Sequence, residues 1–152
     1  MAIAVGSVSN TPTYGTRTNS TITAPTGITN GDLLVAVLHA GNSAGTAVTV
    51  TPPSGFTEVT NSPITESYSG YTIASHVYYK VAASESGNYT FNHTSADTEG
   101  YMYRLTGADT STPIDVTPAT AVANLVNNGT TTELATITTV TNGAFIIAQD
   151  SA

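Results

Sequence analysis

Short runs of β-branched and aromatic residues, separated by turns rich in glycine, proline and asparagine, recur along most of the chain. Apolar positions with the helical period are almost absent. Roughly eight to ten such runs, spaced by about 8 to 12 residues, are typical of sandwiches and barrels. The pattern therefore predicts an all-β fold, a single-domain antiparallel β-sandwich of jelly-roll-like form over residues 25–152. Residues 1–24 are expected to form an N-terminal arm or an edge strand.

Two segments indicate how deeply individual strands are expected to lie. The sequence LLVAVL at residues 33–38 is continuously apolar and follows an Asn-Gly turn, which predicts a central strand covered on both faces. The sequence NYTFNH at residues 88–93 alternates, with Tyr89, Phe91 and His93 on one face and the other three residues on the opposite face, which predicts a half-buried strand.

The segment at residues 71–81 also alternates, and its two faces are predicted to differ. The face predicted to be apolar holds Tyr71, Ile73, Ser75, Val77, Tyr79 and Val81. The face predicted to meet solvent holds Thr72, Ala74, His76, Tyr78 and Lys80. Nearer the C-terminal end, ELATITTV at residues 133–140 and the apolar run at residues 144–148 are read as further strands.

Charge excludes several classes of partner. Ten acidic residues against three basic ones give a net charge of −7, and Arg17, Lys80 and Arg104 lie far apart in the sequence. Because these cations cannot form a basic patch, nucleic acid and anionic membranes are not expected partners. There is no cysteine, which excludes disulfides and thiolate chemistry.

The N-terminal sequence MAIAVGSVSN has neither a basic segment nor a long apolar one, so it does not resemble a secretory signal. No run approaches the roughly 18 to 20 apolar residues of a membrane helix. The composition nevertheless resembles that of an exported protein. Assembly in a host cytoplasm followed by release on lysis would satisfy both observations, and a processed signal or a recombinant start methionine is the alternative.

The segment YMYRLTGADTSTPIDV at residues 101–116 combines two tyrosines, an arginine and two aspartates. On a strand, Tyr101 and Tyr103 would pack on one side, together with Leu105, while Met102 and Arg104 would point to the other. The sequence after Gly107 predicts a turn in which Asp109 accepts hydrogen bonds from nearby backbone amides.

Catalytic and metal chemistry find little support in the sequence. His93, Asp97 and Glu99 lie within seven residues in a predicted loop, but neither calcium-loop spacing nor a zinc ligand set is present. No nucleophile elbow is found, and a Ser-His-Asp set assembled across strands cannot be recognised from sequence. The expectation is a protein that is not an enzyme, with no cofactor and no metal.

Sugar binding is the competing interpretation. Exposed aromatic rings can stack on pyranose rings, with asparagine and aspartate as hydrogen-bonding partners. The chain has no tryptophan, and the alternation assigns Tyr71 and Tyr101 to buried faces. Tyr68 and Tyr78 are therefore the candidate glycan-binding residues under this reading.

Five segments in a fixed order resemble a known family. They are PTGITNGDLLVAVL, TPPSGFTEVT, VYYKVAASESGNYTF, YRLTGADTSTPIDV and TNGAFIIA. Together they resemble the β-sandwich module of phage virion proteins, which is also seen in bacterial surface proteins, over about residues 25–148. The family has no catalytic motif to transfer, and similar modules often continue beyond the last of these segments.

The resemblance implies a phage virion structural protein, most naturally a capsid decoration (cement) protein on the exterior of a particle assembled in the host cytoplasm. Its expected partners are the major capsid protein and other copies of itself, with a homotrimer as the form expected from the class. The alternative is a tail or surface adhesin module that binds host glycan.

Overall fold

The computed structural model describes residues 2–11, 15–116 and 138–148, and it confirms the all-β prediction. Within these residues there is no helix, and eight antiparallel strands form one sheet. The strands are β1 (Ala4–Asn10), β2 (Thr16–Ile22), β3 (Leu33–Asn42), β4 (Val50–Thr51), β5 (Thr57–Glu58), β6 (Ile64–Tyr68), β7 (Tyr71–Val81) and β8 (Tyr89–Thr106). The jelly-roll-like sandwich and the division at residue 24 stay predictions.

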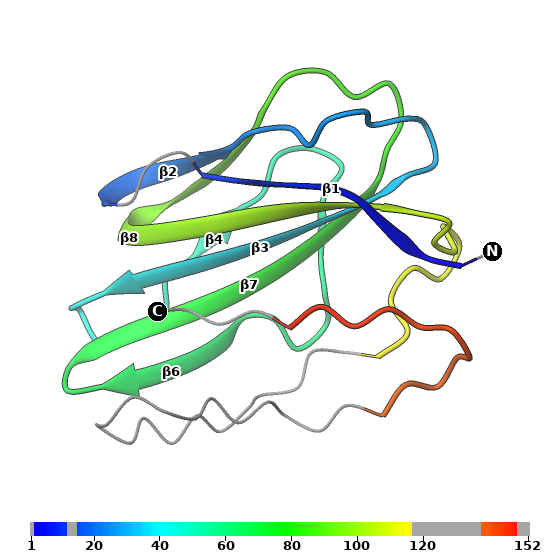
Figure 1. Ribbon diagram of the computed structural model, residues 1–152. Coiled ribbons are helices and arrows are strands. Elements are labelled where there is room, and N and C mark those ends of the chain that lie inside the picture. Colours follow the sequence, from blue (N-terminus) through cyan, green and yellow to red (C-terminus); the bar gives the residue numbers. More distant parts are fainter. Residues whose placement is uncertain (1, 12–14, 117–137, 149–152) are drawn as a thin grey trace.

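β8 organises the sheet because it pairs with four other strands. The main order is β1-β8-β3-β7-β5, with β6 on β7, and with β2 and β4 on β8 (Figure 1). The first half of β8 pairs with β2 and β4, and its second half pairs with β1 and β3. The segment predicted as an arm or an edge strand, residues 1–24, thus contains two strands, β1 and β2, and both pair with β8.

A bulge near the middle of β8 changes which side chains face inward. Tyr89, Phe91 and His93 are buried, Thr94 and Ser95 are both exposed, and the even-numbered positions from Ala96 to Met102 are then buried. The pairing of β2 with β8 shifts register at the same level. A bulge bends a strand and increases its twist. Both halves of β8 therefore face the same core.

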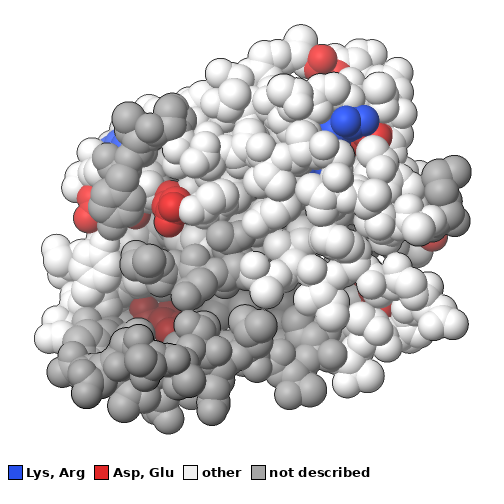
Figure 2. Space-filling model, in the orientation of Figure 1, with Lys and Arg blue, Asp and Glu red and all other residues white. Residues whose placement is uncertain are grey.

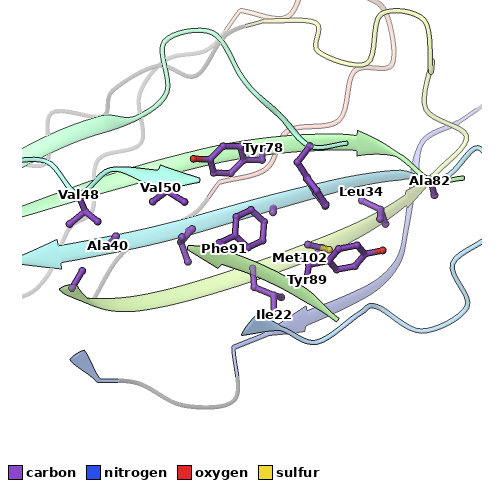
Figure 3. Packing of buried hydrophobic residues seen from close by; sticks show 14 residues of the cluster. Ile22, Leu34, Ala40, Val48, Val50, Tyr78, Ala82, Tyr89, Phe91 and Met102 are labelled. Atoms are coloured by element: carbon purple, nitrogen blue, oxygen red, sulfur yellow. The ribbon is translucent and has the colours of Figure 1, made fainter. Parts of the chain in front are cut away.

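The main core lies on one side of the bent sheet (Figure 3). It consists of Ile22, Leu34, Ala36, Leu38, Ala40, Val48, Val50, Phe56, Tyr78, Ala82, Tyr89, Phe91, Ala96 and Met102. Phe91 is central, because its ring centroid lies 5.5 Å from that of Tyr78 and 5.6 Å from that of Phe56. Edge-to-face and tilted ring contacts of this kind add to the energy of apolar burial.

The face prediction for β7 was wrong. The face predicted to meet solvent is the one that enters the core, where Ala74 and Tyr78 are fully buried and His76 is 3% exposed. The opposite face, which was predicted to be the apolar one, is half-buried. The alternation itself was read correctly, but polar side chains occupy the inner face because partners from other segments satisfy their hydrogen-bonding atoms, as described below.

A smaller cluster covers the other side of β3. Leu33, Val35 and Leu105 are buried there, and the half-buried side chains packed on them are Ile3, Val77, Tyr79, Val81, Tyr103, Ala108 and Ile147. With the main core on its even-numbered positions, β3 is covered on both faces from Leu33 to Ala40, which confirms the prediction from its apolar sequence.

The C-terminal strand prediction was wrong for residues 144–148. This stretch has no regular secondary structure, and Phe145 and Ile146 are 42% and 55% exposed (Figure 1). The other predicted C-terminal strand spans residues 133–140, and its residues 133–137 lie outside the described part of the chain. An apolar run needs a partner strand to become a strand, and within the described residues this run pairs with none.

Candidate functional site

The bulge in β8 separates the three residues that suggested a metal or acid-base site. These residues lie on strand β8 and not in the predicted loop. His93 points into the core, whereas Asp97 and Glu99 lie on the opposite face of the strand. No group of three or more histidine, aspartate or glutamate side chains in the described ranges could hold a metal ion.

His93 instead forms a buried hydrogen-bonded pair with Ser20 of β2. The Nε2 atom of His93 lies 2.9 Å from the Ser20 hydroxyl, and Nδ1 lies 2.8 Å from the Thr94 carbonyl oxygen. Because a carbonyl only accepts, Nδ1 is the donor to Thr94, and in that tautomer Nε2 is the acceptor for the Ser20 hydroxyl. A nucleophile, a base and an orienting acceptor are thus in line, as hydrolytic sites require.

Burial makes this pair inaccessible to a substrate. Ser20 is 0% exposed, and its hydroxyl lies 2.6 Å from the equally enclosed hydroxyl of Thr98. The arrangement therefore acts as a satisfied polar network that joins β2 to the neighbouring strand β8 on the core face of the sheet, since buried polar groups must be hydrogen-bonded. Sequence reasoning missed it because Ser20 and His93 are 73 positions apart.

Tyr78, one of the two candidate glycan-binding residues, belongs to a second buried network. Its hydroxyl lies 3.2 Å from Nδ1 of His76, and that nitrogen lies 2.8 Å from Oε1 of Glu58. The other ring nitrogen of His76 lies 3.0 Å from the Val48 carbonyl. Burial raises the pKa of Tyr78 well above its ordinary value, and the negative charge of Glu58 raises it further. A ring that is 0% exposed cannot stack on a sugar.

Tyr68, the other candidate, is described only through its backbone, which pairs with Tyr71 between β6 and β7. Its side chain lies outside the described part of the structure. The glycan role of Tyr68 therefore stays a prediction.

Two other tyrosines, Tyr71 and Tyr101, meet carboxylates on the outer face of β8. The Tyr71 hydroxyl donates to Oδ2 of Asp97 at 3.4 Å, and the Tyr101 hydroxyl donates to Glu99. The hydrogen bond to Glu99 raises the pKa of Tyr101. Both rings are half-buried rather than buried. These pairs are the part of the described surface that most resembles a sugar-binding patch.

The segment at residues 101–116 divides much as predicted. Asp109 accepts the backbone N–H of Ser111 at 2.8 Å, and this bond, with one from Thr112, lowers the pKa of Asp109. Arg104 is partly buried. Its Nε donates to Oδ2 of Asp32 at 2.7 Å, in a pair whose side chains are 18% and 8% exposed.

Exposed apolar side chains form two groups. On β1 they are Val5 and Val8, and the second group comprises Val116, Val140, Phe145 and Ile146. Neither residues 2–11 nor residues 138–148 contain a charged side chain. Figure 2 shows few charged side chains among the described residues on the face in view.

Comparison with known proteins provides no relative for this chain. No protein-family model, no curated protein and no solved structure matches it. Within the described residues there is no helix long and apolar enough to cross a membrane.

Proposed function

We propose that the chain is a structural protein of a phage virion, a decoration protein that binds an assembled coat and stabilises it. The observation that supports this proposal most directly is the uncharged C-terminal segment, which leaves Phe145 and Ile146 exposed. Large exposed apolar side chains mark contact surfaces for other proteins. A function that depends on surface contact also fits a chain whose Ser20–His93 pair is closed to substrates.

Hydrogen bonds to Asp115 and apolar packing hold residues 138–148 against the rest of the protein. Asp115 accepts the backbone N–H of Val140 at 2.8 Å and also bonds Thr141, and these bonds lower the pKa of Asp115. Ile147 packs on the small cluster around Leu33. The segment is therefore anchored at both ends while Phe145 and Ile146 point outward, which reduces the entropy lost on binding.

The energy available from one copy is modest. Burying a large apolar side chain completely contributes about 1.5 to 3 kcal/mol, so two side chains that are already half-covered would contribute about 2 kcal/mol together. A protein that occupies many equivalent positions on a shell adds this energy at every position. Because it binds the assembled shell and not free subunits, it shifts the equilibrium toward the shell.

Charge supports a protein partner over an anionic polymer. Two of the three cations in the sequence are already paired, Arg104 with Asp32 and Lys80 with Glu85 at 2.9 Å. The net charge of −7 would repel nucleic acid. The proposed contact surface is therefore apolar and uncharged.

Immunogold electron microscopy of phage particles is the first test, with label expected over the heads. Purified assembled shells and free coat subunits would then be compared in a sedimentation assay. The double variant Phe145→Ser and Ile146→Ser should lose shell binding. The matched control, Ala44→Ser and Ala47→Ser in an exposed loop, should retain it. Label confined to tails, or equal binding of free subunits, would contradict the decoration proposal.

A tail or surface adhesin that binds host glycan is the second candidate. The pairing of Tyr101 with Glu99 and of Tyr71 with Asp97 on one half-exposed face favours it. Binding on a glycan array that is lost in Tyr101→Ala would support this candidate. An array without binding would remove it.

A further inference from the structure

Within the described part of the chain, β1 is a sheet edge with few of the usual features that protect an edge against pairing with another strand. Among the described residues it pairs only with β8. Natural edge strands are commonly protected by lysine, proline or inward-pointing charge. Residues 2–11 contain no proline and no charged side chain. A feature of the described strand that can protect it is the register shift between Val5 and Ser7.

That register shift places two exposed valines on the same face of the edge. Val5 pairs with Leu105 and Val8 pairs with Tyr103, and these two positions of β8 share a face. Val5 is 43% exposed and Val8 is 50% exposed. The edge therefore presents two apolar side chains on either side of its midpoint.

The other face of β1 is already occupied by its own chain. Ser7 donates a hydrogen bond to the Thr26 carbonyl at 2.9 Å, and Ser9 donates to the Thr23 carbonyl at 2.5 Å. Beneath the strand, the guanidinium of Arg104 lies so close that a Cβ at Gly6 would be 3.0 Å from its Nη1. Since Asp32 neutralises that guanidinium, the edge carries no uncompensated charge.

We propose that β1 pairs antiparallel with β1 of a second copy across a two-fold axis between Gly6 and Ser7. In that register Val5 of one copy lies opposite Val8 of the other, and the contact occurs twice. The register shift between Val5 and Ser7 makes this pairing possible, because in a regular strand Val5 and Val8 would lie on opposite faces. The inference is independent of the coat-binding proposal, which concerns the C-terminal segment.

A second copy fits this edge better than a charged partner does. Two chains of net charge −7 repel each other, and this repulsion is weakest when the surfaces in contact carry no charge, as is the case for β1. The strand is also self-complementary, since each half carries one of the two valines. A basic partner would gain nothing from an uncharged edge and would be drawn to the acidic side chains elsewhere.

Sedimentation equilibrium of the full chain tests the proposal. The wild-type protein is expected to be in monomer–dimer equilibrium. Val8→Lys should raise the dissociation constant by about tenfold, because it replaces two valine pairs and places a charge at the edge. Val140→Lys, at a position 84% exposed, adds the same charge away from β1 and should leave the constant unchanged. Circular dichroism would verify that both variants fold.

Hydrogen exchange locates the contact independently. The amides of residues 4–10 should exchange more slowly as the protein concentration rises. A wild-type protein that remains monomeric, or that forms a trimer, would overturn the proposal. So would a dimer in which Val8→Lys associates as tightly as the wild type, in which Val140→Lys is equally weakened, or in which residues 4–10 gain no protection.

Discussion

Tyr78 provides the most direct test of which side of β7 forms the core. Its side chain is 0% exposed, its ring packs 5.5 Å from Phe91, and it stacks on His76 with a centroid distance of 5.9 Å. A tyrosine buries roughly 200 Å². At about 25 cal/mol per Å² this corresponds to about 5 kcal/mol. Because that figure is an upper estimate, we expect Tyr78→Ala to cost about 3 to 5 kcal/mol.

Two further variants separate packing from hydrogen bonding. Tyr78→Phe removes only the hydroxyl near His76 and should cost about 1 kcal/mol. Tyr79→Ala truncates a half-buried ring on the other face of the same strand, so it should cost clearly less than Tyr78→Ala.

Urea unfolding followed by far-UV circular dichroism measures these differences. With a slope of about 1 to 3 kcal/mol per molar urea, the loss expected for Tyr78→Ala lowers the midpoint by about 2 M. If Tyr78→Ala were within about 1 kcal/mol of the wild type, or less damaging than Tyr79→Ala, the assignment of the core face would be wrong.

Two other predictions concern an ion pair and a close approach. Burial would raise the pKa of Asp32, but hydrogen bonds from Arg104 and Thr29 outweigh this effect, and the folded pKa lies below its ordinary value. The ionised Asp32 therefore stabilises the fold above the unfolded pKa of about 4, and this contribution is lost as pH falls through the lower folded pKa. Asp32→Asn should therefore cost about 2 kcal/mol at pH 7 and flatten the acid limb in urea melts across pH; an unchanged limb would count against it. A Cβ at Gly41 would lie 2.6 Å from the Tyr71 ring, so Gly41→Ala should cost about 1 to 2 kcal/mol. Tyr71→Ala should remove most of that penalty in a double-mutant cycle, and simple additivity would refute the clash.

Strand positions with purely local causes could be predicted from the sequence. The continuous apolar run from Leu33 to Leu38 indicated burial on both faces, and the structure confirms it. The alternation placed Tyr89, Phe91 and His93 on one face of a half-buried strand, and in the structure all three are buried. In both segments the character of the side chains alone decides which face is buried.

Features that depend on distant partners could not be predicted. His76 and Thr72 seemed unsuited to a core, but Glu58 and Val48 satisfy His76, and the Ser67 hydroxyl lies 2.8 Å from that of Thr72. The bulge in β8 has no glycine or proline to mark it. It therefore could not be seen that His93 faces away from Asp97 and Glu99, or that Ser20 would meet His93.

The position of β8 in the chain has a consequence for how the protein is made. β1 and β2 leave the ribosome before β8, yet among the described strands their pairing partner is β8, which is complete only when residue 106 has been added. Such long-range pairing slows folding, because the chain loses the entropy of closing a large loop before the stabilising contacts form. During synthesis the uncharged strand β1 therefore has no β8 to pair with until residue 106 has been added. Neighbouring chains on one messenger RNA would then be close together while β1 of each can still pair with β1 of another.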